Sequence, residues 1–490
     1  MLEVANSPKD GERELESVSF VPEPLDRFAT VLTPDEYAAL LRTADVAKGL
    51  LARRTIWNLT STARGGGVAE MLTSLLPLAG GAGVDVRWLV IHAEEQFFRV
   101  TKRIHNRLHG DPGDGGELGS KERAAYESVL KARGAKLTSF LGPSDVVILH
   151  DPQTAGLAPI LRRAGAKVIW RCHVGVDVPN ALVESAWQFL STYLLAADAY
   201  VFTRLAYAWK GLRRETIAVI PPSIDIFAPK NQPLTADQVE GILAVTGLVE
   251  GRGRDARFVR MDGSIDAVLR RTDLSGGGPV PEGASLVTQI SRWDRLKDPV
   301  GLVRGFAEYV APRSDAHLVV AGPSVAAVSD DPEGFETLAE VRKVWSGFAP
   351  DLRARIHLAC LPMDDPEENA AIVNALQRRA SIVIQKSLAE GFGLTVAEAM
   401  WKERPIVAAR VGGIQDQLSD GVSGLLIDPT DLPAFGRAVL SLLEDPSLAS
   451  KLARAAHLRC REEYLASKHL TRYVRLLEVL LSGRGSPEGP

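Results

Sequence analysis

The sequence predicts an α/β fold with two doubly wound domains, each built on a parallel sheet. Three observations support this prediction. Short apolar strands alternate with helical segments along most of the chain, a pattern typical of parallel sheets covered by helices. The alternation lapses over residues 226–284 and then resumes, which indicates two domains separated by a linker that carries an insertion. The length of 490 residues also exceeds what one hydrophobic core normally fills.

The composition excludes several classes of protein. Lys and Arg total 57 and Asp and Glu total 61, a formal net charge of −4, so no basic excess attracts nucleic acid or an anionic membrane. Cys172, Cys360 and Cys460 form no CxxC pair, which argues against a disulfide framework or a zinc site. No run of about 20 apolar residues is long enough to span a membrane, and the charged N-terminus has no secretory apolar region. We therefore expect a cytoplasmic protein.

The first domain opens with a helix over 33–51. Thr33 is its expected N-cap, Pro34 its first residue and Glu36 the capping-box partner. Six apolar runs then predict strands, at 55–59, 86–92, 146–150, 168–173, 199–202 and 218–220. Helical segments at 120–134, 155–165 and 181–196 lie between several of them. We assign residues 1–225 to this domain and expect the C-terminal helix, about 466–482, to pack back on it.

The second domain, 285–465, shows the same alternation. Its predicted strands are 286–290, 317–321, 356–359, 381–385, 406–408 and 424–427. In open parallel sheets, ligands bind beyond the carboxyl ends of the strands. We therefore expect the two domains to face each other across a cleft that both of them line.

Residues 386–400, KSLAEGFGLTVAEAM, are the most informative segment. Glu390 and Glu398 flank the turn Gly391-Phe392-Gly393, and a helix is predicted to start near Leu394. Glycines let the backbone approach a ligand closely, and a helix N-terminus offers N–H groups to an anion. Glu390 suits sugar hydroxyls, and Glu398 suits the vicinal hydroxyls of a ribose. The spacing alone also fits a solvated glutamate before a helix and another on its exposed face.

Two further segments carry groups that suit phosphate. Arg292 and Lys297 follow the strand 286–290 and can clamp a diphosphate together, although a solvated charged loop has the same composition. Residues 65–67 form a Gly-Gly-Gly turn before a helix, a possible nest of backbone donors. This turn is neither GxGxxG nor a Walker motif, so the fingerprints of nicotinamide binding and ATP hydrolysis are missing.

Together these segments resemble the retaining glycosyltransferases of the GT-B fold, family four, over about residues 57–473. The motifs GGGVAEM, WRCHVGVD, SRWDRLKDP and EGFGLTVAEAMW are most similar to those of the trehalose glycosyltransferring synthases. The resemblance implies two Rossmann-like domains with parallel sheets facing across a cleft. Family members usually have Gly where this chain has Ser291 and Asp298, a departure that keeps both charges of the phosphate pair.

The resemblance implies a retaining glucosyltransferase that makes α,α-trehalose from ADP-, UDP- or GDP-glucose and free glucose. The departing diphosphate helps to deprotonate the incoming hydroxyl in a front-face route, and the cations stabilise its charge. The implied catalytic residues are Arg292, Lys297, His173 and Glu390. The implied donor-binding residues are Gly66, Gly67, Gly391, Phe392, Gly393, Leu394 and Glu398. The implied acceptor-binding residues are His150, Asp151 and Gln153.

The expected partners are small-molecule substrates, with no nucleic acid and no membrane. Whether the chain forms a homodimer is left open. We expect no tightly bound cofactor and no dedicated metal ligands, and at most a Mg²⁺ ion associated with the nucleotide. A trehalose phosphorylase, a transferase with another acceptor and a non-catalytic nucleotide-sugar sensor remain alternatives. The segment 149–153 carries no Lys or Arg, which favours glucose over glucose 6-phosphate. Arg171 and Arg204 are the nearby cations that would reverse this preference.

Overall fold

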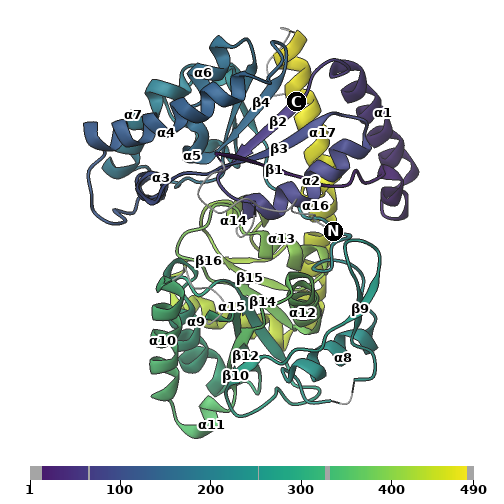
Figure 1. The fold of residues 1–490 in the computed structure, drawn as a ribbon. Helices are drawn as coiled ribbons and strands as arrows, with labels where there is room; N and C mark the ends of the chain where they lie inside the picture. Colours follow the sequence, from purple (N-terminus) through teal and green to yellow (C-terminus); the bar gives the residue numbers. More distant parts are fainter. Residues whose placement is uncertain (1–13, 64–66, 252, 326–331, 483–490) are drawn as a thin grey trace. The chain divides into compact units, whose positions relative to one another are not determined.

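The computed structural model describes residues 14–63, 67–251, 253–325 and 332–482. The chain divides into two compact units, Met1–Ser223 with Ala466–Pro490, and Ile224–Leu465 (Figure 1). Each unit contains a seven-stranded sheet in its described part. No helix in these ranges is long and apolar enough to cross a membrane. The α/β fold class predicted from the sequence is confirmed.

The sheet of the first unit has the order β1-β3-β2-β4-β5-β6-β7. Its strands are β1 (Leu15–Val18), β2 (Ile56–Thr60), β3 (Val86–Ile91), β4 (Val146–His150), β5 (Lys167–Cys172), β6 (Ala199–Phe202) and β7 (Ile217–Val219). All neighbours are parallel except β1, which pairs with β3 in the antiparallel direction. The six strands predicted from apolar runs are present. β1 was not predicted, because its sequence LESV has no apolar run.

Helices cover both faces of this sheet (Figure 1). They are α1 (Pro34–Leu50), α2 (Gly67–Gly81), α3 (Glu95–Leu108), α4 (Ser120–Thr138), α5 (Asp151–Ala155), α6 (Ala158–Arg163), α7 (Ala181–Leu194) and α17 (Ala466–Ser482). Ile56 and Ile148 pack with α1, α2 and α17, whereas Trp57 and Leu149 pack with α3 to α7. Alternation along each strand thus supplies two cores. The capping box predicted at Thr33 is present.

The sheet of the second unit has the order β10-β13-β12-β11-β14-β15-β16. Its strands are β10 (Asp273–Ser275), β11 (Leu286–Ile290), β12 (His317–Pro323), β13 (Ile356–Leu361), β14 (Ile382–Gln385), β15 (Ile406–Ala409) and β16 (Leu425–Ile427). Only β10 runs antiparallel to its neighbour. The helices are α8 (Ala236–Thr246), α9 (Pro299–Gly305), α10 (Pro332–Ser346), α11 (Pro350–Arg353), α12 (Pro366–Arg379), α13 (Leu394–Trp401), α14 (Ile414–Gln417), α15 (Leu432–Glu444) and α16 (Pro446–Glu463).

The segment 226–284, expected to be a linker with an insertion, instead contributes structure to the second unit. Its helix α8 buries Ile242 and Leu243 in the core shared with α12, and β10 extends the sheet. Between them lies an antiparallel hairpin of β8 (Arg257–Val259) and β9 (Ile265–Ala267). The Gly- and Pro-rich ends of the segment suggested a linker, but its interior carries apolar side chains that a folded core buries.

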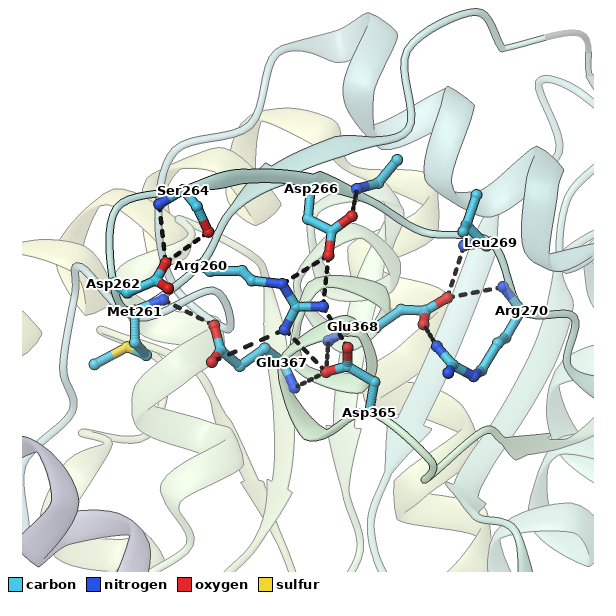
Figure 2. A network of polar contacts seen from close by, with 11 residues as sticks. Arg260, Met261, Asp262, Ser264, Asp266, Leu269, Arg270, Asp365, Glu367 and Glu368 are labelled. Atoms are coloured by element: carbon cyan, nitrogen blue, oxygen red, sulfur yellow. Dashed lines mark hydrogen bonds and ion pairs between the residues drawn. The ribbon is translucent and has the colours of Figure 1, made fainter. Parts of the chain in front are cut away.

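Polar contacts fix the β8–β9 hairpin to the N-terminus of α12 (Figure 2). The Arg260 guanidinium donates to the carboxylates of Asp266 and Asp365. Glu368, which is buried, accepts hydrogen bonds from the backbone N–H groups of Leu269 and Arg270, both at 2.7 Å. These contacts join residues that lie about one hundred positions apart in the sequence.

Candidate active site

The predicted site residues fall into two groups, one in each unit. In the second unit, Arg292 and Lys297 follow β11, and Glu390 follows β14, which is hydrogen-bonded to β11. The Lys297 ammonium forms an ion pair with Oε2 of Glu390, which also lies 3.3 Å from Oγ of Ser387. The Arg292 side chain is 68% exposed and lies 3.2 Å from the Asp294 carboxylate. The two predicted cations therefore share one loop, one paired with a glutamate and the other presented to solvent.

Buried polar contacts hold the loop after β11 against the loop after β14. Gln289, at the end of β11, donates from Nε2 to the backbone carbonyl of Lys297 at 2.8 Å. Its Oε1 accepts a hydrogen bond from the backbone N–H of Lys386 at 2.9 Å. The N–H of Leu388 donates to the carbonyl of Leu296 at 2.7 Å. These bonds set the separation of Lys297 and Glu390, and sequence reasoning identified none of them.

The conformation of Asp298 explains how this chain dispenses with the glycine that family members usually have at this position. Asp298 adopts φ +47°, the left-handed region that favours glycine, and its carboxylate accepts the N–H of Gly301 at 2.9 Å as the N-cap of α9. The same carboxylate pairs with Lys386, whose side chain is 1% exposed. Aspartate is one of the few residues that tolerates this backbone, and here the ion pair and the cap offset its cost.

The glycine turn before α13 is also held tightly. Gly393 has φ +90°, and a Cβ there would lie 3.1 Å from Cγ1 of Ile414 and 3.3 Å from Cγ of Glu390. Gln417 donates to the backbone carbonyl of Phe392, and the Phe392 ring packs edge-on against Tyr464 at 5.5 Å. Phe392 is therefore a buried packing residue. The backbone from Gly391 to Leu394, where α13 begins, remains the predicted donor-binding part.

Glu398 lies within α13 and is only 4% exposed. Nζ of Lys230 lies 3.6 Å from its Oε1, and Nε2 of Gln377 lies 3.4 Å from its Oε2. Beneath it, Lys402 donates to Oε1 of Gln377 at 2.6 Å and to Oδ1 of Asn231 at 2.8 Å. Burial lowers the pKa of Lys402 to about 7.

Lys230 and Lys402 were both missed by sequence reasoning. Lys230 lies in the segment that was expected to be a linker. Lys402, one residue after α13, gave no signal beyond its charge.

In the first unit, β4 and β5 bring His150 and His173 together. Nδ1 of His150 lies 3.1 Å from Nε2 of His173, and Nε2 of His150 lies 3.1 Å from Oδ1 of Asn58 on β2. Burial, and next the Arg171 cation, lower the pKa of His150 to about 3. The same two causes hold the pKa of His173 well below its usual value. Both imidazoles are therefore neutral at physiological pH.

Asp151 follows β4 in an unusual conformation. Its φ of +61° places a non-glycine residue in the left-handed region, a form of local strain that often marks functional sites. Its Oδ1 accepts the backbone N–H of His173 at 2.8 Å, and burial raises the pKa of its carboxyl to about 7. Oε1 of Gln153, on α5, is buried and has no hydrogen-bond partner in the part of the chain that the structure describes.

The glycine turn at 65–67 is described only in part. Gly67 is the first residue of α2, whereas Gly66 lies outside the described residues. Its role in donor binding stays a prediction.

The cations nearest this group are engaged elsewhere. Arg171 is buried and donates to His469 at 3.0 Å, to the Tyr473 hydroxyl at 2.5 Å and to the carbonyl of Ile220 at 3.2 Å. Arg204 pairs with Asp177. Arg171 thus anchors α17 to β5, and its hydrogen bonds are made there, while its charge still acts on His150, Asp151 and His173.

The described ranges contain no group of three or more His, Cys, Asp or Glu side chains that could hold a metal ion. The expectations of no dedicated metal ligands and of at most a nucleotide-associated Mg²⁺ ion both stay predictions.

Comparisons with known proteins identify the fold and the family of this chain. Residues 271–459 match the family model "Glycosyl transferases group 1", and the chain is a glycosyltransferase of the GT-B fold. An α,α-trehalose-phosphate synthase (UDP-forming) from Burkholderia xenovorans, solved with glucose-6-phosphate, has a similar fold. The TM-score is 0.62 at 17% identity, over 87% of this chain and 100% of that one.

Sequence similarity narrows the class. Residues 58–209 match the model "Trehalose synthase, N-terminal domain". The chain is 34% identical to a trehalose synthase of Rubrobacter xylanophilus over 88% of this chain and 92% of that protein. It is 25% identical to a trehalose phosphorylase of Grifola frondosa, over 85% of this chain but 57% of that protein. The chain belongs to the trehalose synthase family.

Proposed function

We propose that this glycosyltransferase transfers glucose from a nucleoside diphosphate glucose to free glucose and forms α,α-trehalose with retention at the donor carbon. The observation that carries the proposal is the set of charges after β11 and β14, where Lys297 pairs with Glu390 and Arg292 is exposed on the same loop as Lys297. The chain's membership of the trehalose synthase family supports α,α-trehalose as the product.

The charges after β11 and β14 suit a sugar diphosphate. Arg292 is exposed and offers a guanidinium fork to phosphate oxygens. Lys297 is held by Glu390 and by the Gln289 contact to its carbonyl, so its ammonium is preorganised where charge develops on the leaving group. In this role the two cations act in the transition state, and Glu390 also accepts a hydrogen bond from a sugar hydroxyl.

Glu398 is proposed to bind the ribose. Its contacts with Lys230 and Gln377, at 3.6 Å and 3.4 Å, are long, so hydroxyl groups are able to replace them.

Free glucose is proposed as the acceptor. A phosphate dianion needs charged donors to replace its water shell, and both nearby guanidinium groups are engaged, Arg171 with α17 and Arg204 with Asp177. The polar groups left after β4 are the Asp151 carboxyl and the unpartnered Gln153 oxygen, which suit neutral hydroxyl groups.

A front-face route is proposed for the transfer. A double displacement needs a carboxylate nucleophile, and Asp151, whose pKa is raised to about 7 by burial, is only partly ionised at neutral pH. Instead, the bond from the anomeric carbon to the diphosphate breaks as the acceptor hydroxyl approaches the same face. The acceptor proton passes to a phosphate oxygen of the leaving group.

Product analysis tests this proposal. In two assays the protein is incubated with ADP-, UDP- or GDP-glucose and either glucose or glucose 6-phosphate as the acceptor. In a third assay it is incubated with trehalose and inorganic phosphate. Trehalose formed from glucose supports the proposal. A faster rate with glucose 6-phosphate points to a trehalose-phosphate-forming enzyme, and glucose 1-phosphate released from trehalose and phosphate points to a phosphorylase.

A further inference from the structure

Asn58 is a buried polar residue in the middle of the central strand β2. It is 3% exposed and lies between two parallel neighbours, β3 and β4, where an aliphatic side chain is the usual occupant. Its side chain contributes to the wall of an apolar cavity with Ile56, Ile148 and residues of α1, α2 and α17. Its Nδ2 has no hydrogen-bond partner among the described residues. A buried orphan donor is costly, so the residue needs an explanation that packing does not supply.

The oxygen atom of the Asn58 amide supplies this explanation. Oδ1 lies 3.1 Å from Nε2 of His150, and Nδ1 of His150 lies 3.1 Å from Nε2 of His173. The two imidazole planes differ by 13° with centroids 5.4 Å apart, the arrangement that an in-plane N–H···N hydrogen bond requires. Three side chains thus form one continuous chain of hydrogen bonds from β2 to the residue after β5.

The direction of this chain follows from the donors and acceptors. An amide oxygen only accepts, so Nε2 of His150 carries the proton. A neutral imidazole has one N–H, so Nδ1 of His150 accepts. Nε2 of His173 must then donate, which leaves Nδ1 of His173 unprotonated. Because burial keeps the pKa of both rings low, no second proton disturbs this order.

We propose that Asn58 is a positioning residue, which fixes His173 in the tautomer whose Nδ1 accepts a hydrogen bond from a hydroxyl group of a sugar substrate. This inference rests on the proposed function for the identity of the sugar. It adds a specificity rule, because an acceptor at Nδ1 requires a sugar group that donates.

The first experiment observes the tautomer directly. Protein labelled with ¹⁵N-histidine is studied by ¹⁵N NMR, and His150→Gln and His173→Gln assign the two rings among the nine histidines. The proposal expects both rings to be neutral and protonated at Nε2. A His173 ring protonated at Nδ1 would overturn it. This spectrum needs no substrate, so it tests the relay even if the proposed reaction does not occur.

The second experiment removes the Asn58 oxygen that accepts the hydrogen bond from His150. Asn58→Leu keeps the branching of the side chain and replaces the orphan amide by an apolar group that suits the apolar cavity. We expect kcat to fall about 10- to 100-fold with KM nearly unchanged, and the melting temperature not to fall. Thr43→Val, which lines the same cavity, is the matched control with unchanged kcat.

The outcomes distinguish a failure of the positioning role of Asn58 from a failure of the proposed function. An Asn58→Leu variant with normal kcat and an unchanged His173 tautomer would refute the positioning role. A wild-type protein with the expected tautomers but no glucosyl transfer would refute the proposed function and leave the relay intact. If Asn58→Leu does not fold, the His150 and His173 tautomers in the wild-type spectrum still decide.

Discussion

The Lys297 ammonium and the Glu390 carboxylate form an ion pair that joins the loops after two adjacent strands, β11 and β14. The two residues are 93 positions apart in the chain. The pair is flanked by the contacts of Gln289 with both loops. A cation preorganised in this way does not have to be reoriented when charge develops on a leaving phosphate.

Arg292→Ala is expected to lower kcat by roughly 10²–10³ with a smaller change in KM, because a transition-state donor is lost. Steady-state kinetics with saturating acceptor measures this effect. Arg295→Ala is the matched control, since Arg295 belongs to the same loop, is exposed and pairs only weakly with Glu336 at 3.5 Å. A raised KM with normal kcat would mean that Arg292 binds the ground state alone.

Glu398→Gln is expected to weaken nucleotide binding by about 1–3 kcal/mol, because a charged hydrogen-bond acceptor for the ribose is lost. Isothermal titration calorimetry with ADP, UDP and GDP measures the change. Glu444→Gln, an exposed charge near the end of α15, controls for net charge. Unchanged affinity would return Glu398 to a purely structural role with Lys230 and Gln377.

Asp151→Asn is expected to raise the KM for glucose by about tenfold, the effect of one lost charged hydrogen bond, and to leave nucleotide affinity unchanged. Initial rates at saturating donor give the first quantity and calorimetry the second. Burial raises the pKa of this carboxyl to about 7, so the KM of the wild type should change between pH 6 and 8. An identical pH profile in the variant would show that Asp151 does not contact the acceptor.

Arg260→Ala is expected to lower the free energy of unfolding, because it frees the β8–β9 hairpin from α12 (Figure 2). Urea titration followed by circular dichroism measures the loss, with Arg257→Ala on the same hairpin as control. The Arg260 hydrogen bond is the main cause that lowers the pKa of Asp365 from 3.8 to about 2. Because the pKa of this carboxyl is lower in the folded state, its ionised form stabilises the fold above pH 3.8. This stabilisation is lost as the pH falls toward 2. The difference between variant and wild type should therefore shrink over that window.

The strands were predictable because most are rich in buried apolar residues, as in β6 and β15. β1 was not, since an edge strand with polar residues has no such run. The segment 226–284 was misjudged because the partners that order its hairpin, Asp365 and Glu368, lie far along the chain. Local composition carries no information about such partners.

The candidate site was predictable where chemistry and spacing coincide, as for Arg292, Lys297 and Glu390. The contacts that position these residues were not. Gln289 and Asn58 lie within buried strands, and only the pairing of strands shows that they reach the loops after β11 and β14 or the histidine after β4.

Transfer of a labelled anomeric carbon tests the central claim most directly. UDP-[1-¹³C]glucose, or the ADP or GDP form that the protein accepts, is incubated with unlabelled glucose and followed by ¹³C and ¹H NMR. The account predicts labelled α,α-trehalose, with the ¹³C-bound proton showing the small coupling of an α linkage and with release of the nucleoside diphosphate. A β linkage at the labelled carbon would contradict the retaining mechanism, and nucleotide release without a disaccharide would contradict the transfer itself.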